Sequence, residues 1–480
     1  MSTRITTITC LFARLMIWTC IAKVLLGTTI YGDQNSDITI QHIADQITSH
    51  IDEEAAKNDG YFKIKHEGET LHLNLIRVHM EYLSNLGDGV QFACVDLVEE
   101  GGTIYDLDFY LEGTHPDELN VTETTIHKID GKPLYVWEQR EDLTWHRVPV
   151  AEADDELHGV VRGQDHFQFT YRFDIPELSE LAQLWVPLAQ TDEFQKVRIQ
   201  KMSIPAASEL VTDRSGQNTA LAMQLGPEQS GETMSIRYEV IRKESGPYKG
   251  HEATSLEQYL QPQSLVPNDP MFAERVQEAL AGSSATNDLM RARELYKHTL
   301  ETMRYQRFGD GWGVGDAVYA CDARTGNCSD FHSYFIALCR SVGIPARFIV
   351  GAAIPSHRNE GGIVGYHCWA EFHAQGEWWP IDVSEADKHE LMADYYFGKK
   401  PANRIEISRG RDLLFKGMRS NKAFNFLVYP ILEHANVHTT IRPELEFERS
   451  ASQTPKASPG ENDSELISSK TVTDSVTTND

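Results

Sequence analysis

Residues 326–332 read GNCSDFH and open the most regular helical pattern in the chain. Apolar side chains then recur at the 3.6-residue spacing of one helix face. The stripe consists of Phe331, Tyr334, Phe335, Leu338, Cys339 and Val342. Gly343 and Pro345 come directly after it, which is a usual way for a helix to end. The pattern therefore predicts a helix that begins at Cys328 and stops before Gly343.

The thiol of Cys328 is expected in the first turn of this helix. Unpaired N–H groups and the helix dipole favour an anion there, so they lower the pKa of a thiol. A buried and unreactive cysteine is the commoner case. The residues that follow argue against that interpretation.

Two runs rich in aromatic and branched residues predict a β-hairpin downstream. If Ala374 and Gln375 form a two-residue turn, paired positions sum to 749, and His367 lies directly opposite Asp382. Cross-strand neighbours have Cβ atoms roughly 4.5–5.5 Å apart, which allows an imidazole–carboxylate hydrogen bond. A bulge at Gly376 would shift this register by one residue. The two runs are HCWAEF at 367–372 and EWWPIDV at 377–383.

A thiol, an imidazole and a carboxylate in this order form the nucleophile, base and orienting group of acyl-transfer catalysis. In that scheme His367 takes the proton of Cys328, and Asp382 fixes the tautomer of the histidine. Backbone N–H groups near the helix start can hold the developing oxyanion. The sequence therefore predicts attack of a thiolate on a carbonyl group.

Four runs resemble the core of the transglutaminase-like superfamily, and a fifth, GWGVGDAVYAC at 311–321, is similar to that of its bacterial secreted members. The resemblance covers about residues 285–390. It implies a Cys328–His367–Asp382 triad on a papain-like α+β core, without a metal or a cofactor. Members hydrolyse amides, as in cysteine proteases, or transfer the acyl group to an amine. A non-catalytic binding protein on the same fold is a further alternative. The four runs are GNCSD at 326–330, GIPAR at 343–347, HCWAEF at 367–372 and WPID at 379–382.

A metal site is the main rival interpretation of this region, because cysteines and histidines are dense there. No pair has the usual spacing of zinc ligands, so we expect no metal. We expect Cys339 in the apolar core and Cys368 on the strand face opposite His367. His332 is expected as a polar wall of the cleft or as a solvated residue. The full set is Cys321, Cys328, His332, Cys339, His357, His367, Cys368 and His373.

Further residues near the predicted triad are candidates for supporting the reaction. Tyr305, Trp312 and Trp369 are candidates for lining the cleft or donating to the oxyanion, although an aromatic core is an equally good explanation. Asp330 falls in the first helical turn, where a carboxylate satisfies exposed N–H groups, so we expect a structural role. Glu371 shares a strand face with His367 and is also interpreted as structural.

Length and charge restrict the class of protein. A chain of 480 residues predicts two to four domains. Its net charge is −27, from 71 acidic and 44 basic residues. This balance argues against nucleic-acid binding and against docking on anionic lipid. The expected partner is a peptide or protein substrate, and the oligomeric state stays open.

The first 32 residues resemble a secretory signal or an N-terminal anchor. Two arginines precede an apolar run at 15–27, which Lys23 interrupts, and no clean cleavage site follows. We therefore expect export to the periplasm or outside the cell. Removal of this segment leaves an odd number of cysteines, which predicts at least one free thiol. They are Cys94, Cys321, Cys328, Cys339 and Cys368.

The rest of the chain divides into four predicted units. A helix stripe at Ile40, Ile43, Ala44, Ile47 and Ile51, followed by short strands, predicts an α+β accessory domain at 37–148. Alternating residues predict an immunoglobulin-like β-sandwich at 158–246. The catalytic domain is expected at 265–440, and a disordered tail at 444–480. The histidines of the accessory domain are interpreted as scattered surface or satisfied residues; they are His72, His79, His127 and His146.

Overall fold

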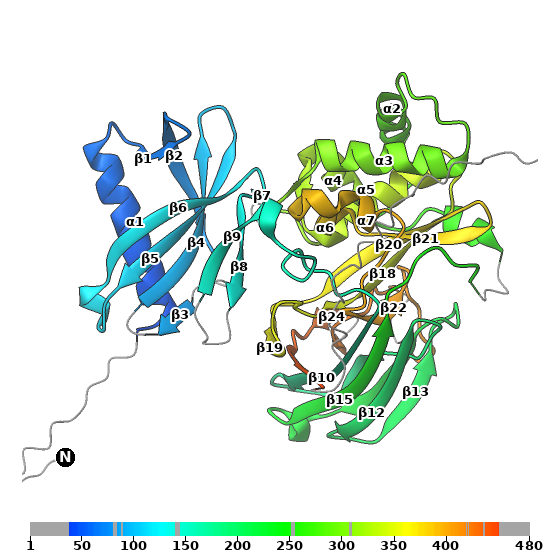
Figure 1. Cartoon of the computed structure of the whole chain (residues 1–480). Coiled ribbons are helices and arrows are strands. Elements are labelled where there is room, and N and C mark those ends of the chain that lie inside the picture. The colour runs from blue at the N-terminus through cyan, green and yellow to red at the C-terminus, as the bar shows by residue number, and fades with distance from the viewer. Residues whose placement is uncertain are drawn as a thin grey trace, which may run out of the picture.

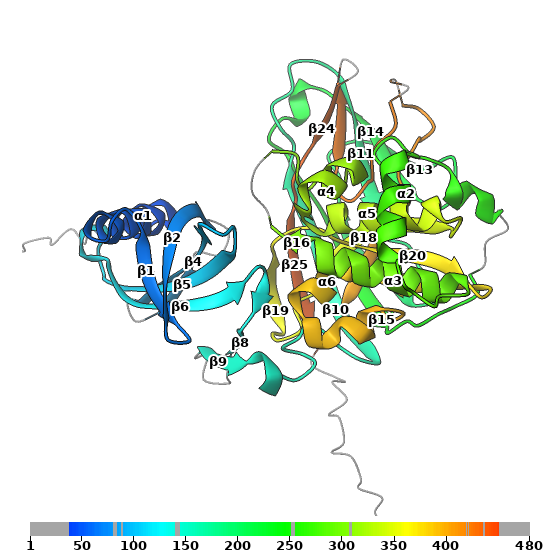
Figure 2. The ribbon, with the colours of Figure 1, turned by 90° about the horizontal axis from the view of Figure 1, so that it is seen from above.

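The computed structural model describes residues 38–79, 84–87, 90–139, 145–250, 255–306, 310–418, 420, 422–434 and 437–450. The predicted signal segment lies outside these ranges. An N-terminal lobe stands beside a larger body that combines helices, a central sheet and a β-sandwich (Figure 1). The view from above shows the same two parts side by side (Figure 2). Within the described ranges, no helix has both the length and the apolar character needed to cross a membrane.

The N-terminal lobe is one helix on an antiparallel sheet. Helix α1 (Ile40–Lys57) buries its predicted stripe against the sheet, except that Ile40 is 50% exposed. The sheet has the order β1-β2-β4-β5-β6-β7, with β3 paired to β4, and β8 and β9 form a separate hairpin. The strands are β1 (Phe62–His66), β2 (Glu69–Val78), β3 (Ser84–Gly87), β4 (Val90–Glu99), β5 (Ile104–Glu112), β6 (Asn120–Ile129), β7 (Lys132–Pro133), β8 (Tyr135–Gln139) and β9 (Trp145–Pro149).

The turn between β6 and β7 joins the lobe to the larger body. Asp130 and Gly131 have φ of 50° and 84°, as a two-residue type I′ turn requires. The turn touches the body through two ion pairs, Asp130 with Arg304 at 3.4 Å and Lys132 with Glu390 at 3.1 Å. The lobe therefore meets the body close to the segment that precedes Cys328.

The β-sandwich consists of two five-stranded sheets, ordered β12-β15-β10-β25-β19 and β13-β14-β11-β23-β24. Its first six strands fall within the predicted range 158–246, but the last four come from residues assigned to the predicted catalytic domain and the tail. The first six are β10 (Gln164–Asp174), β11 (Ala182–Leu188), β12 (Gln195–Ser203), β13 (Ser208–Thr212), β14 (Thr219–Leu225) and β15 (Thr233–Lys243). The other four are β19 (Glu360–Ile363), β23 (Ile431–His434), β24 (Val437–Thr440) and β25 (Glu444–Arg449).

Strand β25 corrects the predicted start of the disordered tail. Leu445 and Phe447 alternate with exposed glutamates and pair with Tyr171 and Phe169 of β10. The polar composition of the long C-terminal stretch concealed this short period-two pattern. Residues 444–449 are therefore a strand, and the sandwich is assembled from distant parts of the chain instead of residues 158–246 alone.

The part of the body that carries the predicted triad is a four-stranded sheet, β21-β20-β18-β22, covered by helices. One apolar core runs without interruption from the sandwich through these helices, so the two parts pack as a single body. The strands are β18 (Ala346–Ala353), β20 (His367–Ala374), β21 (Glu377–Ile381) and β22 (Arg404–Arg409). The helices are α2 (Pro270–Ala279), α3 (Asp288–Thr302), α4 (Ala317–Ala323), α5 (Cys328–Ser341), α6 (Val383–Lys388) and α7 (Ala393–Tyr396).

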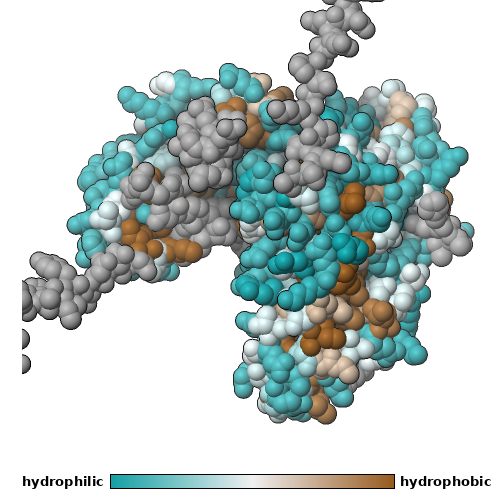
Figure 3. Space-filling view, turned by 60° about the horizontal axis from the view of Figure 1, so that its bottom comes forward, coloured by the Kyte–Doolittle hydropathy of each residue, from teal (hydrophilic) through white to brown (hydrophobic). Residues whose placement is uncertain are grey.

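The outer surface is mostly hydrophilic on the face shown in Figure 3, with hydrophobic residues gathered on its lower part. Among the large apolar side chains that are exposed, several belong to β12, β13 and the loop between them. They are Ile199, Met202, Ile204 and Leu210.

Candidate active site

Helix α5 begins and ends where its sequence predicts. Asn327 caps the first turn, accepting from the N–H of Ser329, and Asp330 completes a capping box. At the other end Gly343 has φ of 76°, and the N–H of Ile344 donates to the carbonyl of Cys339. This is a Schellman ending, which needs a residue in the left-handed region. Cys328 is therefore the first residue of a well-capped helix.

Asp330 fixes the loop in front of the helix. Its carboxylate accepts from the N–H groups of Gly313, Gly315 and Asn327 at 2.7–2.9 Å. Gly326 has φ of 155°, and a Cβ there would lie 2.4 Å from the Asp330 carboxylate, so a larger residue would displace this cap. The structural role predicted for Asp330 matches these contacts, and the loop at 311–315 is bound to the helix start.

The hairpin that carries the histidine has a different register from the predicted one. Ala374 pairs with Glu377, so the turn residues are Gln375 and Gly376, with φ of 55° and 81°. Paired positions sum to 751 instead of 749, because Gly376 supplies the left-handed position that a type I′ turn favours. A shift of two residues leaves every side chain on its original face.

His367 and Asp382 meet despite the shifted register. The histidine Nε2 lies 2.6 Å from the carboxylate Oδ2. In the observed register the position opposite Asp382 would be Trp369, so His367 is its diagonal neighbour. Strand β21 ends at Ile381, and Asp382 leaves the strand to cap helix α6 by accepting from the N–H of Glu385. The contact predicted from the sequence is present, but the direct opposition was wrong.

The thiol of Cys328 hydrogen bonds to His367, which completes a chain of three contacting side chains. Cys328, His367 and Asp382 are only 2%, 5% and 3% exposed. The structure thus brings together the three residues that the sequence predicted as a triad, in a site that is shielded from bulk water.

Charge in this site favours a thiolate beside an imidazolium. Burial opposes ionisation of Cys328, but hydrogen bonds from Cys368 and His367, and nearby positive charge, hold the pKa of its thiol well below the usual value. Burial likewise opposes the charge on His367, but Asp382 and the thiol raise the pKa of the imidazole to about 9. Both shifts have the direction that a nucleophile–base pair needs at neutral pH.

His332 is a positioning residue that the sequence reasoning missed. It is fully buried, and neither a cleft wall nor a solvated residue. Its Nδ1 lies 2.6 Å from the carbonyl oxygen of Cys328, and its Nε2 accepts from the N–H of Val383 at 3.2 Å. These two bonds require a neutral ring, and burial lowers the pKa of His332 accordingly. His332 therefore ties the start of α5 to the start of α6, one residue after Asp382.

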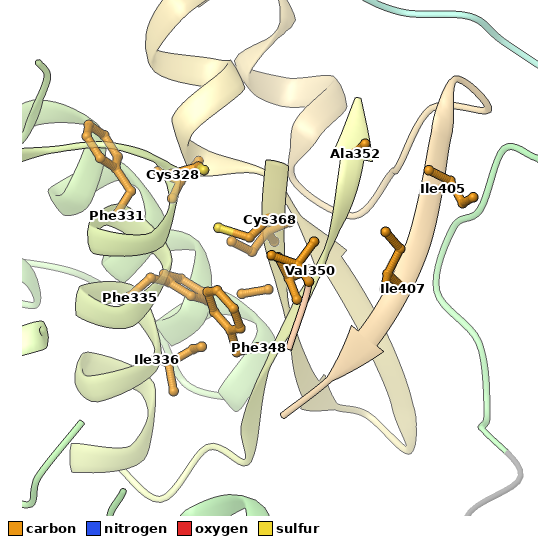
Figure 4. Close-up of a cluster of buried hydrophobic side chains, with 14 of the residues drawn as sticks. Cys328, Phe331, Phe335, Ile336, Phe348, Val350, Ala352, Cys368, Ile405 and Ile407 are labelled. Atoms are coloured by element: carbon orange, nitrogen blue, oxygen red, sulfur yellow. The ribbon is translucent and has the colours of Figure 1, made fainter. Parts of the chain in front are cut away.

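Cys368 also lies closer to the nucleophile than predicted. Its side chain does alternate away from His367, but the other face of β20 packs on α5, so its thiol reaches that of Cys328. Its sulfur also lies 3.6 Å from Nδ1 of His332. Figure 4 shows both sulfur atoms at the boundary between the helix start and the strand. Cys368 thus lies on the predicted strand face, but helix α5 covers that face, so the side chain belongs to the surroundings of the nucleophile.

Glu371 has the structural role expected of it. It is fully buried, and its carboxylate bonds to Arg347 at 2.8 Å and to the hydroxyl of Tyr248 at 2.9 Å. Burial alone would raise the pKa of Glu371, but Arg347 and Lys400 lower it to about 2. The side chain therefore joins the four-stranded sheet to the segment that follows β15.

The aromatic candidates take different positions. The ring of Tyr305 packs 6.0 Å from that of Phe331 and beneath Lys388, which matches the aromatic-core alternative. Trp312 lies half-buried in the loop bound by Asp330. Trp369 is 1% exposed, with its ring centroid 6.2 Å from that of His367.

Trp369 and Gln306 each carry a buried side-chain donor that lacks a hydrogen-bond partner among the described residues. One is Nε1 of Trp369, which was a predicted candidate. The other is Nε2 of Gln306, which the sequence reasoning missed. The backbone N–H of Gln306 donates to Gly326, where β16 (Arg304–Tyr305) pairs in parallel with β17 (Thr325–Gly326). This short pairing bonds Gln306 to Gly326, which lies two residues before Cys328 in the sequence, a relation that no local sequence pattern reveals.

All five cysteines in the described ranges are free and buried. The groups of side chains in these ranges that could hold a metal ion lie in the N-terminal lobe, and neither includes a residue of the Cys/His zone around Cys328. Of the residues in this zone, Cys328, His332, His367 and Cys368 are linked to one another by hydrogen bonds.

The family comparison agrees with the residue pattern. Residues 276–383, which contain Cys328, His367 and Asp382, match the model of the transglutaminase-like superfamily. The resemblance drawn from the sequence is thereby confirmed, and this chain carries a transglutaminase-like core within a mixed α+β architecture.

Individual relatives are distant. An uncharacterized protein of Haemophilus influenzae is 25% identical over 334 residues, which cover 59% of this chain and 90% of that protein. A structure named "Putative Cysteine Protease" from Cytophaga hutchinsonii matches with a TM-score of 0.39 and 17% identity, covering 60% of this chain and 98% of that chain. The periplasmic domain of TgpA from Pseudomonas aeruginosa matches with a TM-score of 0.24 and 14% identity, covering 50% and 94%.

Proposed function

We propose that this protein is a cysteine enzyme that hydrolyses an amide of a peptide or protein through a thioester. The observation that carries the proposal is the contact chain from Cys328 through His367 to Asp382, with the thiol pKa lowered and the imidazole pKa raised. A protein that only binds a partner has no need for this charge arrangement. It is the arrangement that acyl transfer requires.

The residues can perform both halves of the reaction. The Cys328 sulfur attacks the amide carbon, and the carbonyl electrons move to oxygen. When this intermediate collapses, the C–N bond breaks and His367 gives its proton to the leaving nitrogen, which leaves a thioester. Neutral His367 then takes a proton from water as the water attacks, and the carboxylic acid departs from the sulfur. Asp382 stabilises the imidazolium in both halves.

The oxyanion needs donors on the side of the helix start. The backbone N–H of Cys328 lies in the first turn, where N–H groups have no partner within the helix. Nε2 of Gln306 is buried without a partner among the described residues, and the backbone N–H of the same residue donates to the carbonyl of Gly326, two residues before Cys328 in the sequence. We assign these two groups as oxyanion donors, since donors that are fixed before the reaction stabilise the transition state most. Nε1 of Trp369 is the alternative second donor.

Water is the acyl acceptor that we propose. An amine acceptor would use the same thioester but would need a subsite that binds it in competition with water. Transfer of a glutamine acyl group to an amine is the alternative outcome. We further infer an exported protein, on the strength of the signal-like residues 1–32.

One experiment separates the three outcomes. Full-length protein and its Cys328→Ala variant are incubated with a peptide library and a labelled primary amine, and products are identified by mass spectrometry. New chain ends or side-chain acids that depend on Cys328 support hydrolysis, whereas labelled amides support transfer. If neither product forms and a neutral thiol electrophile labels Cys328 no faster than the other cysteines, the enzyme proposal fails.

A further inference from the structure

A second constellation of cysteine, histidine and aspartate lies in the N-terminal lobe, far from the triad in sequence. Cys94 on β4, Asp106 and Asp108 on β5, and His127 on β6 occupy neighbouring strands, and Cys94 is directly paired with Asp108. Their neighbours Val95, Leu97, Leu107 and Phe109 pack against α1 in the lobe's core. The four side chains therefore share the opposite face, where His127, interpreted from the sequence as a surface or satisfied histidine, contacts Asp108.

The inward-facing atoms of this group converge closely. The sulfur of Cys94 lies 2.8 Å from Oδ1 of Asp106 and 3.0 Å from Oδ1 of Asp108. Nδ1 of His127 lies 3.4 Å from the same oxygen of Asp108 and 4.0 Å from the sulfur. A thiol has one proton and can donate to only one of the two carboxylates. At the other contact, lone pairs of the sulfur and of a carboxylate oxygen face each other. A bound cation would remove this repulsion.

The outer oxygens of both carboxylates are held by other groups. Lys128 donates to Oδ2 of Asp106 at 3.0 Å, and the hydroxyl of Tyr135 donates to Oδ2 of Asp108 at 2.7 Å. The ring of Tyr135 also stacks on that of His127, with centroids 4.7 Å apart. Metal sites commonly show this division, in which one oxygen is held by a neighbour and the other is directed to the ion.

A β-bulge in β6 directs the side chain of His127 towards Cys94, Asp106 and Asp108. Asp106 pairs with Lys128 and Leu107 pairs with Ile126, so His127 is the extra residue of a β-bulge. Strict alternation would turn His127 towards Leu107 and the core. Bulges are frequent beside functional sites because they redirect one side chain. Here the bulge brings an imidazole to a buried pair of carboxylates and a thiol.

We propose that Cys94, Asp106, Asp108 and His127 bind one divalent transition-metal ion, with zinc as the best match. Thiolate, imidazole and carboxylate together suit zinc, whereas magnesium and calcium avoid sulfur. Tetrahedral zinc with its usual bond lengths keeps ligand atoms about 3.5 Å apart. The four separations given above, 2.8–4.0 Å, bracket that spacing, and all four ligand atoms lie within 4.8 Å of one another. Asp96 and His79, 3.0 Å apart, adjoin the site through Asp106 and extend its polar surroundings.

The test uses the full chain, stripped with a chelator and titrated with Co²⁺ and then Zn²⁺. We expect one ion per chain, a thiolate-to-cobalt charge-transfer band, and displacement of cobalt by zinc. Cys94→Ser should abolish the band and weaken binding by at least about 100-fold. Tyr135→Phe keeps all four ligands but loses an outer hydrogen bond, so it should weaken binding by about 10–100-fold.

Two matched controls exclude other thiols. Cys321→Ser changes another buried cysteine, and Cys328→Ala removes the nucleophile of the other site, so both variants should keep the band and the affinity. Loss of the band in Cys328→Ala, an unchanged band in Cys94→Ser, or less than one bound ion per chain in the wild-type protein would each overturn the proposal. If Cys94→Ser does not fold, the wild-type stoichiometry and the Tyr135→Phe affinity still decide.

Discussion

The two buried cysteines Cys328 and Cys94 sit among the same residue types but in opposite electrostatic surroundings. At Cys328 an imidazole lies between the thiol and the carboxylate, and the pKa of the thiol is held well below its usual value. At Cys94 burial and the direct contact with Asp106 and Asp108 raise the pKa of the thiol well above it. One site favours an anion on sulfur without an added ion, and the other does not.

The difference shows that composition alone does not define a site. Which atom touches the sulfur decides the chemistry, because a neighbouring imidazolium favours a thiolate whereas a neighbouring carboxylate disfavours it. The helix start adds to the first case, since its N–H groups also favour an anion. The strand position of Cys94 offers no such help.

Replacing the nucleophile should give the largest effect. A neutral electrophile at pH 7 should label Cys328 rapidly in the wild-type protein, and Cys328→Ala should lose that label and all turnover, because no other thiol in the described ranges has a lowered pKa. Peptide mapping by mass spectrometry measures the label. Cys94→Ser serves as the control and should label like the wild type. Equal labelling of Cys94 and Cys328 would remove the contrast between the two sites.

Replacing the orienting carboxylate should be the next largest change. Asp382→Asn should lower the pKa of His367 from about 9 and reduce turnover by about 10²–10⁴-fold, because the charge that favours the imidazolium is lost. NMR titration of the His367 ring and the pH profile of kcat measure the two effects.

The direction of the pH effect follows from the sign of the shift. The folded pKa of His367 lies above the unfolded value of about 6.5. Its contribution to the free energy of unfolding is therefore complete below pH 6.5 and is lost as the pH rises through about 9. The alkaline fall in kcat should move to lower pH in Asp382→Asn. An unmoved alkaline limb would mean that another group protonates the leaving nitrogen.

A smaller effect is expected from the second thiol of the active site. Cys368→Ala removes a hydrogen-bond donor to the Cys328 thiolate, so the pKa of Cys328 should rise. A hydrogen bond to a charged group is worth about 1.5–3 kcal/mol, so labelling at pH 6 should slow by about 10-fold or more. Stopped-flow labelling across pH measures the shift. Cys339→Ala, on the same helix but further from the site, is the matched control and should label at the wild-type rate.

The smallest effect is expected at Cys94, the second cysteine of the comparison. Asp108→Asn in chelator-treated protein removes one of the two carboxylates beside Cys94, so the pKa of the Cys94 thiol should fall. Burial, the largest cause of the raised pKa, remains, so the thiol should stay less acidic than Cys328. Ultraviolet absorbance of the thiolate during a pH titration in a Cys328→Ala background measures it. An unchanged or higher pKa would show that the carboxylate contact is not what separates the two sites.

Much of the active site could be predicted because its signals are local. The helix at Cys328 has a complete stripe, cap and glycine ending, and the hairpin runs identify His367 and Asp382. The predicted turn was misplaced by one residue. The observed turn is defined by positive φ at both Gln375 and Gly376, and the pairing of the two strands decides which residues adopt it. The roles of His332 and Gln306 were missed because they depend on contacts with other elements, with Val383 for His332 and with Gly326 for the backbone of Gln306.

The sequence by itself determined the catalytic helix, the order of the three candidate triad residues and their chemistry, because spacing and residue type are properties of short segments. Only the tertiary structure decided what surrounds them. Packing of β20 on α5 brings Cys368 to the nucleophile, and the return of β25 completes the sandwich. A bulge in β6 turns His127 towards Cys94, which made one cluster out of residues that looked unrelated. These relations arise from contacts between distant segments, and no local pattern encodes them.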